Sequence, residues 1–427
     1  MKLGSSPEQF IWASGVEDTF VPQERPGHRA LDEYLLMGHY EHWREDLSLA
    51  ADLGLQAIRW GVPWYRVEPF PNEYDWRWTD AVVDFLLERE ITPIVDLIHY
   101  GCPYWLRREF ASAEYPAAVA AYASAFTRRY GDRIRWYTPL NEPLVNALMC
   151  GKLGQWPPYL RGDSGYIRVL LQLVKGMQFT AEAIRAQVNE PILVWVEAVG
   201  LHVAFSDALE VLAAEDRRRG YISYDLLTGR VDTAHPLFPW LIRNGASLHD
   251  LEEIARHRVS LDVLGTNFYP QWSRQSVTLD ARGRLEYRSA EDDGAAFGSI
   301  LHDYHARYGA PIIVTETSAF GTDEVRARWL DSSVAEVRRL RGQGVPILGY
   351  TWFPMLPMID WKYRVGRKPR EAYRIELGLY TSRDPGDPGA SRWKPTPLVE
   401  QLRALVADPV SSVGPLLPAV ESQETRR

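Results

Sequence analysis

Eight short runs of β-branched or aromatic apolar residues recur along the chain, and longer amphipathic stretches separate them. This alternation indicates repeated βα units, whose strands lie parallel because each intervening helix returns the chain to the same edge of the sheet. Eight such units predict a closed (β/α)8 TIM barrel, which belongs to the α/β class. The expected strands are 10–13, 55–60, 92–98, 134–140, 192–196, 263–269, 311–315 and 346–352.

The stretches between these runs have the spacing of amphipathic helices. An open, doubly wound sheet could also use eight parallel strands, but it usually has a glycine-rich phosphate turn after the first strand, and the sequence shows none. The barrel is therefore the preferred interpretation. The clearest helix candidates are 42–53, 78–90, 117–130, 166–189, 299–308 and 324–341.

A chain of 427 residues can form one barrel domain, because this fold commonly reaches such a length as a single unit. We assign residues 1–406 to the catalytic barrel. Residues 407–427 are rich in Pro, Ser and Val and end in polar residues, so we expect a loosely ordered C-terminal tail.

Composition excludes several classes of function. A net charge of −8 does not suit a nucleic-acid binder, which needs a concentrated basic surface. Cys102 and Cys150 lack metal-ligand spacing, and no cofactor motif is present, so we expect neither a metal nor a cofactor. With no apolar signal-peptide core or membrane-spanning run, the sequence predicts a cytoplasmic protein, and its preference for Arg over Lys is typical of a GC-rich bacterial gene. The oligomeric state is left open.

Reactive residues of a barrel lie at the carboxyl ends of its strands. Several predicted strands end in titratable or hydrogen-bonding side chains, and two of these ends supply a glutamate. We expect all of these side chains to face one cavity. They are Arg59, His99, Asn141, Glu142, Asn267, Tyr269, Glu316 and Trp352.

Glu142 and Glu316 form the pair of carboxyl groups that cleavage of a glycosidic bond requires, one as an acid and one at the anomeric carbon. A single glutamate at a strand end can simply cap a helix or pair with an arginine. The presence of two such glutamates among other polar strand-end residues favours a catalytic role. Arg59 and Tyr269 would keep Glu316 ionised, which makes Glu316 the nucleophile and Glu142 the acid and base. A retaining site would hold the two groups about 5–5.5 Å apart.

The same segments resemble glycoside hydrolase family 1, the β-glucosidase and 6-phospho-β-glycosidase family, over residues 10–405. The stretch HYEHWREDLSLAADLGLQAIRWGVPWYRVEP (39–69) resembles the family's second βα unit, with Arg59 beside the nucleophile. YTPLNEP (137–143) resembles its acid/base motif, and IVTETSAFG (313–321) resembles its nucleophile motif. The resemblance implies a retaining β-glycosidase whose partner is a small-molecule glycoside.

The resemblance also implies roles for residues around the pair. His99 and Asn141 would hydrogen-bond hydroxyls of the sugar in the cleavage subsite, and Tyr269 would orient Glu316. GYTWFPMLPMIDW (349–361) is similar to the family's eighth-strand segment. In it, Trp352 would form the floor of the subsite, and Trp361 would belong to the pair that is usually Glu-Trp.

The chain departs from the family pattern at the end of the first strand. In SGVEDTF (14–20), Gly15 stands where the family has a glutamine that grips two sugar hydroxyls. Thr317-Ser318 replaces the usual Asn-Gly, and the segment from Trp352 to Asp360 is one residue longer than usual. Because a missing hydrogen-bond partner disfavours the hydroxyl it would meet, we expect a deoxy or otherwise modified glycone rather than plain glucose.

Two other functions remain open from the sequence. The altered first strand and the aromatic residues at the mouth would also suit a transglycosidase or a tailoring enzyme that acts on a glycosylated metabolite. A catalytically silent, sugar-binding barrel is the third alternative.

Overall fold

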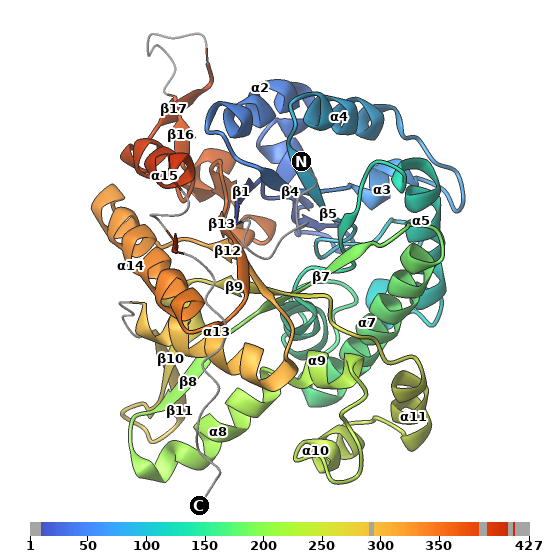
Figure 1. Ribbon diagram of the computed structural model, residues 1–427. Helices are drawn as coiled ribbons and strands as arrows, with labels where there is room; N and C mark the ends of the chain where they lie inside the picture. Colours follow the sequence, from blue (N-terminus) through green and yellow to red (C-terminus); the bar gives the residue numbers. More distant parts are fainter. Residues whose placement is uncertain (1–9, 290–293, 384–390, 409–412, 415–427) are drawn as a thin grey trace, which may run out of the picture.

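A computed structural model of the chain describes residues 10–289, 294–383, 391–408 and 413–414. Eight parallel strands close into a barrel in the order β1-β13-β12-β9-β7-β6-β5-β4, which confirms the predicted fold (Figure 1). All eight predicted runs contribute a strand. The barrel strands are β1 Ile11–Gly15, β4 Ala57–Gly61, β5 Thr92–Asp96, β6 Trp136–Thr138, β7 Ile192–Ala198, β9 Val263–Phe268, β12 Ile312–Thr317 and β13 Ile347–Trp352.

The barrel interior is filled by alternate residues of the strands, because successive side chains of a strand point to opposite faces. These inward residues form a hydrophobic cluster of their own, in which Trp136 is the largest side chain. Closer to the carboxyl ends, the inward residues become polar, as with Arg59 in β4 and Asp96 in β5. The interior cluster consists of Ile11, Ala13, Ala57, Ile94, Trp136, Val194, Val196, Val263 and Ile313.

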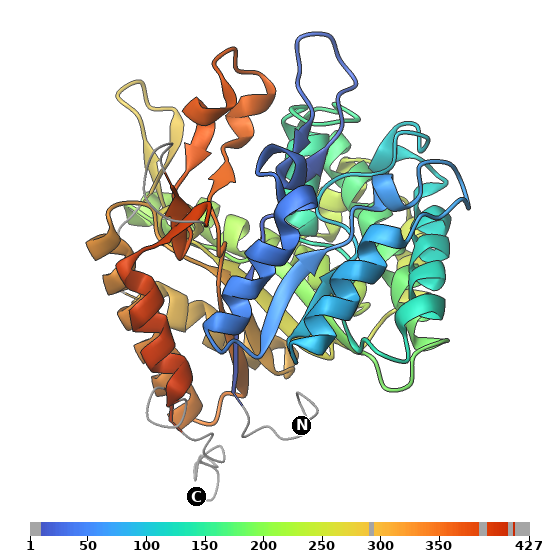
Figure 2. The same cartoon turned by 90° about the horizontal axis from the view of Figure 1, so that it is seen from above.

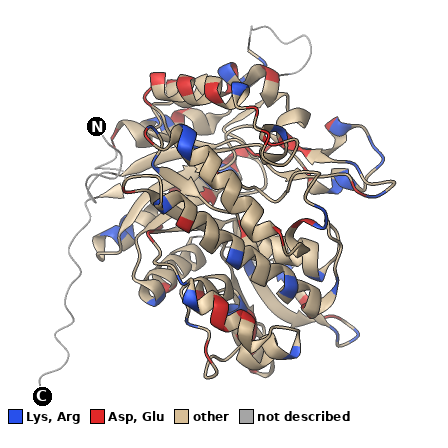
Figure 3. Ribbon diagram, turned by 90° about the vertical axis from the view of Figure 1, so that its right-hand side faces the viewer, with Lys and Arg blue, Asp and Glu red and all other residues tan. Residues whose placement is uncertain are grey.

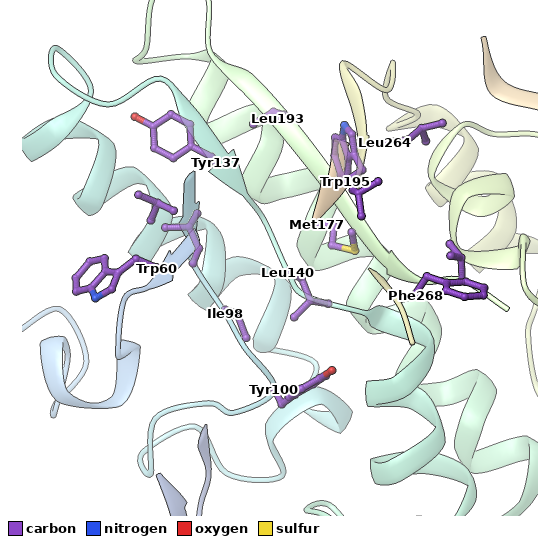
Figure 4. Packing of buried hydrophobic residues seen from close by; sticks show 14 of the residues in the cluster. Trp60, Ile98, Tyr100, Tyr137, Leu140, Met177, Leu193, Trp195, Leu264 and Phe268 are labelled. Carbon is purple, nitrogen blue, oxygen red and sulfur yellow. The ribbon is translucent and has the colours of Figure 1, made fainter. Parts of the chain in front are cut away.

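A second, larger core lies between the outward faces of the strands and the surrounding helices. Figure 4 shows part of it, with Trp60, Tyr137 and Trp195 among its buried rings. The main helices around the barrel are α2 His39–Asp52, α4 Arg77–Glu88, α5 Tyr115–Tyr130, α7 Gly162–Arg185, α13 Ala295–Tyr308 and α14 Asp323–Gly342. These six correspond to the six helices expected from the sequence, with ends displaced by a few residues.

Further elements decorate the barrel. A small sheet has the order β11-β10-β8, with β8 Leu201–Ala204, β10 Arg274–Leu279 and β11 Leu285–Ser289. The shorter pairs are β2 Phe20–Val21 with β3 Leu31–Asp32, β14 Met358–Ile359 with β15 Arg374–Ile375, and β16 Tyr380–Ser382 with β17 Trp393–Pro395. The remaining α-helices are α1 Glu33–Leu36, α3 Trp64–Val67, α6 Pro143–Asn146, α8 Glu210–Arg219, α9 Ile222–Leu227, α10 Phe238–Arg243, α11 Leu248–Arg256, α12 Pro270–Ser273 and α15 Pro397–Ala407.

Most of the predicted C-terminal tail lies outside the described residues, which include only 407, 408, 413 and 414 of it. Helix α15 ends at Ala407, so the expected limit of the barrel domain at residue 406 falls at the end of this helix. The division into barrel and tail stays a prediction.

The loops that follow the strands gather at one end of the barrel. Figure 2 shows the loop between β2 and β3, the segment after β13 and the hairpin β10–β11 at the top. Acidic and basic residues are interspersed on the face in Figure 3. Among the described helices, none is both long and apolar enough to cross a bilayer.

Candidate active site

Glu142 and Glu316 lie at the carboxyl end of the barrel, where the sequence placed them. Glu316 is in β12, and Glu142 follows β6 at the start of α6. Both side chains are buried, and each contacts polar groups from neighbouring strand ends. Because the charge of Glu316 affects the titration of Glu142, the two carboxyl groups belong to one electrostatic site.

The Glu316 carboxylate is bound on both oxygens. Arg59 Nη1 donates to Oε1 at 2.5 Å, and the Tyr269 hydroxyl donates to Oε2 at 2.6 Å. Arg59 is itself buried, and its other amino group contacts Asp96 and lies 3.2 Å from Asn141 Oδ1. A guanidinium and a phenol therefore hold this carboxylate in a fixed position through charge-assisted and neutral hydrogen bonds.

Within the described part of the chain, no cation hydrogen-bonds Glu142. The Tyr100 hydroxyl donates to Oε2, and Asn267 Nδ2 lies 2.8 Å from Oε1. Burial and the nearby charge of Glu316 raise the pKa of Glu142 to about 7, although the bonds from Tyr100 and Asn267 act in the opposite direction. The two glutamates therefore have opposite environments.

The backbone around Glu142 adopts an uncommon conformation. Glu142 has a φ of 47°, and Tyr100, which donates to its carboxyl group, has a φ of 78°. The left-handed region costs a residue other than glycine about 1–3 kcal/mol, and such residues cluster at functional sites. Two of them meet in one hydrogen bond here, so the surrounding fold holds this contact in place.

A polar wall extends from the two glutamates toward β1. Asn141 Nδ2 lies 3.0 Å from His99 Nε2, and Asp18 Oδ1 lies 2.8 Å from His99 Nδ1. Although burial opposes it, the charge of Asp18 raises the pKa of His99 well above its usual range. Glu17 Oε1 lies 3.8 Å from His99 Nε2, and burial raises the pKa of Glu17. This wall contains both donors and acceptors of hydrogen bonds.

Asp18, Asp96 and His99 are the group of described residues whose donor atoms could hold a metal ion, since these atoms lie within 4.8 Å of one another. The three side chains already form an ion-paired network, because His99 Nδ1 faces both carboxylates at 2.8 and 3.3 Å. Arg59 binds Asp96 on its other side. Ion pairs among these side chains and Arg59 therefore explain why the two carboxylates and the histidine lie close together.

The structure corrects the prediction that Trp352 forms the floor of the subsite. Trp352 is fully buried in the outer core, and its Nε1 lies 3.4 Å from the Leu377 carbonyl oxygen. The next residue, Phe353, points inward, with the Arg59 guanidinium 5.6 Å from its ring centre. Strand periodicity explains the error, because two adjacent residues of a strand cannot both face the cavity.

Trp361 lies beside the site, as the sequence predicted. It begins the 3-10 helix Trp361–Arg364, and its ring centre is 5.5 Å from that of Tyr100 and 4.9 Å from that of Trp156. Tyr100 in turn contacts Glu142. Trp361 is only partly buried.

Several residues of the site were not predicted from the sequence. Asp96 could have been found, because it follows inward-facing Ile94 by two positions in the same strand. Tyr100 directly follows His99, and Asp18 lies in the segment after the first strand. Neither residue type indicates by itself that a loop turns the side chain toward the site. Glu197 lies one position beyond the expected end of its strand. Its carboxyl group is buried, accepts a hydrogen bond from Ser223 at 2.7 Å and has a pKa raised well above its usual range by burial.

Comparison with known proteins points to one family. The profile described as glycosyl hydrolase family 1 matches residues 14–218, which include Arg59, His99 and Glu142. This match covers just under half of the chain, and it supports a divergent relationship to glycosyl hydrolase family 1. The protein is a β-glucosidase-like glycoside hydrolase. β-Glucosidase A of Thermotoga maritima is 24% identical over 358 residues, covering 76% of this chain and 78% of that protein.

Other relatives are named for different substrates. An aryl-phospho-β-D-glucosidase of Bacillus subtilis is 28% identical, covering 84% of this chain and 89% of its own length. A bifunctional β-D-glucosidase/β-D-fucosidase of Bifidobacterium breve is 25% identical, covering 77% of this chain and 81% of its own length. The fold of this chain is similar to that of a solved β-glucosidase from Thermotoga maritima in complex with glucoimidazole. The TM-score is 0.78 at 19% identity, and the comparison covers 94% of this chain and 98% of that one.

Proposed function

We propose that this glycoside hydrolase is a retaining β-glycosidase that works by double displacement, with Glu316 as nucleophile and Glu142 as acid and base. The observation that supports this most strongly is the contrast between the two carboxyl groups. Glu316 is bound by Arg59 and Tyr269, whereas Glu142 has a pKa raised to about 7. One group is thus suited to attack, and the other to donate a proton near neutral pH.

In the first step, a Glu316 oxygen bonds to the anomeric carbon while the bond from this carbon to the leaving oxygen breaks. Glu142 gives its proton to that oxygen, so the aglycone leaves as a neutral alcohol. Glu316 is then an uncharged ester, which removes a charge that raised the pKa of Glu142. Glu142 consequently becomes a better proton acceptor for the incoming water, and the second displacement restores the original configuration.

Sugar hydroxyls would bind the polar wall around His99. His99 and Asn141 are buried and linked to each other, so their orientation is fixed before a ligand enters. Tyr269 orients Glu316, and Arg59 links Glu316 to Asn141. Trp361 would cover one side of the sugar from its place beside Tyr100. Preorganised donors of this kind contribute to catalysis because they do not have to reorient during the reaction.

We further propose that the glycone is deoxy or otherwise modified at the position that residue 15 would meet. A Cβ atom at Gly15 would lie 2.6 Å from Phe353 Cδ2, so the Phe353 ring occupies the space of a side chain there. No hydrogen bond to a sugar can come from a side chain at this position.

Replacing Gly15 with alanine is expected to destabilise the protein by about 1–3 kcal/mol, the usual cost of overpacking a core. The free energy of unfolding, from denaturant titration followed by circular dichroism, measures this effect. In a Phe353→Ala background the same substitution should cost much less, because its main clash is then absent. An equal cost in both backgrounds would show that Phe353 does not exclude a side chain from position 15.

A panel of nitrophenyl β-glycosides that includes glucose, deoxy sugars and 6-phospho sugars tests the proposed function. The expected result is hydrolysis with release of the β-anomer first, seen by NMR before mutarotation, and a higher kcat/KM for a deoxy glycone than for glucose. Release of the α-anomer would contradict the retaining mechanism. A preference for glucose would contradict the modified glycone.

A further inference from the structure

Glu197 is a fully buried glutamate that takes no part in the proposed displacement. It lies in β7, one residue before that strand ends. Val194 and Val196 of this strand belong to the barrel interior, whereas Leu193 and Trp195 belong to the outer core (Figure 4). Because side chains alternate along a strand, Glu197 has the outward phase of Leu193 and Trp195. Its carboxyl group therefore faces away from the barrel interior, and any effect on the reaction must pass through another residue.

The segment that carries Glu142 is attached to β7 on both sides of that residue. The Glu142 amide nitrogen donates to the Val196 carbonyl oxygen at 3.2 Å. Pro143 has no N–H group, so the next backbone donor along the chain is the Leu144 amide. The Leu144 nitrogen lies 3.4 Å from each carboxyl oxygen of Glu197. Two consecutive residues of one strand thus hold the backbone before and after the proposed acid and base.

Further hydrogen bonds fix the Glu197 side chain itself. Ser223 Oγ in α9 donates to Oε2 at 2.7 Å, and the Ala198 amide nitrogen donates to Oε1 at 3.0 Å. Ser223 is also fully buried, so water does not compete for this bond. Burial of a carboxyl group is unfavourable, and an apolar side chain of similar size would often stabilise a fold more. A role in the site explains the presence of Glu197 better than stability does.

Glu142 needs such a support because of its backbone conformation. Its φ of 47° lies in the left-handed region, which a residue other than glycine occupies only where the surrounding structure holds it. Its carboxyl group must also stay within reach of Tyr100 and Asn267. If the Leu144 amide were released, the chain could return to a more favourable φ. The carboxyl group would then move away from the leaving oxygen.

We propose that Glu197 is a positioning residue, which holds Glu142 in the place from which it protonates the leaving group. This inference rests on the proposed function and adds to it a residue that does not touch the substrate. A displacement of about 1 Å can lower a catalysed rate by about 100-fold. Loss of the support should therefore impair proton transfer by Glu142, while Glu316, on a different strand, keeps its ability to attack.

Glu197→Ala is expected to lower kcat/KM for an alkyl glycoside by about 10- to 100-fold. Its kcat/KM for a dinitrophenyl glycoside should change little, because that leaving group departs without a proton. Glu197→Gln should retain most of the activity on both substrates. Its amide oxygen can still accept from a backbone amide, and the Ser223 hydroxyl can turn to accept from its amide nitrogen. Equal losses on the two substrates in Glu197→Ala would overturn the positioning role.

A double variant separates positioning from general stability. In a Glu142→Ala background, Glu197→Ala should add little to the loss on the alkyl glycoside, because the group that it positions is absent. Asp225→Ala is the matched control, since Asp225 is a buried carboxylate of α9 whose hydrogen bonds go to groups such as His235 and Arg307. This control should lower the denaturation midpoint without changing the ratio of the two kcat/KM values.

Each result bears on one of the two assignments. A loss from Glu197→Ala that is as large in the Glu142→Ala background as in the wild-type protein would overturn the positioning role. If Glu197→Ala does not fold, Ser223→Ala replaces it and should show a smaller loss, confined to the alkyl glycoside. Unchanged activity of Ser223→Ala would then overturn the role. Failure of the proposed function would instead appear in Glu142→Ala alone, as equal losses on the two substrates.

Discussion

Replacing Glu316 with glutamine is expected to lower kcat/KM by about 10⁴-fold or more, because the amide cannot form the glycosyl ester. The side chain keeps its size, and its amide oxygen can still accept from Arg59 or Tyr269. The fold should therefore persist. Hydrolysis of the best nitrophenyl glycoside measures the loss, and the denaturation midpoint checks folding. Glu88→Gln, at an exposed position of α4, is the control and should retain full activity.

Two further experiments, covalent labelling and rescue by azide, test the role of Glu316 directly. An activated 2-deoxy-2-fluoro glycoside should label Glu316 in the wild-type protein, as a mass increase on the peptide that contains it. Azide should restore activity to Glu316→Ala and give the α-glycosyl azide, since the anion attacks in place of the missing nucleophile with a single inversion. Labelling of another residue would contradict the assignment. A protein that binds but is never labelled would be a silent sugar-binding barrel.

The barrel could be predicted because the hydrophobic pattern of each segment reflects whether it forms a buried strand or an amphipathic helix. Each strand is a short apolar run buried on both faces, and each main helix has an apolar side. The small sheet β11-β10-β8 was not predicted because its strands are only partly buried. Half-exposed strands contain polar residues at many positions, so they resemble loops in sequence.

The central part of the site could be predicted from the residues at the strand ends. Arg59, Asn141, Glu142 and Glu316 converge because parallel strands share one end of the barrel. The placement of Trp352 failed, since the sequence alone left the phase of β13 open between two adjacent aromatic residues. Phe353 takes the inward position, and counting from Phe353 also removes the one extra residue before Asp360.

Tyr100 and Asp18 mark the limit of prediction from sequence. Both follow a strand in loops whose course depends on contacts made elsewhere in the fold, as the positive φ of Tyr100 shows. Tyrosine is also common in cores, so its type indicates no role. The contact from Tyr100 to Glu142 became visible only in the structure, and it connects directly to the pH dependence of the proposed reaction.

Removing the carboxyl group of Glu142 should have an effect that depends on the leaving group. Glu142→Ala is expected to lower kcat/KM for an alkyl glycoside by about 10²- to 10⁴-fold, the usual contribution of a general acid. For a dinitrophenyl glycoside the loss in this first step should be small, because that leaving group departs without a proton. Parallel measurements on the two substrates test the assignment, with Glu88→Gln as control. Equal losses on both would show that Glu142 is not the acid.

The pH profile gives an independent check on Glu142. Its pKa of about 7 predicts that kcat/KM for an alkyl glycoside falls as pH rises through 7, because the acid then loses its proton. This alkaline limb should disappear in Glu142→Ala. Tyr100→Phe should move it to higher pH, since the hydrogen bond from Tyr100 lowers the pKa of Glu142 and its removal favours the protonated form. A limb that persists in Glu142→Ala, or moves to lower pH in Tyr100→Phe, would assign the titration to another group.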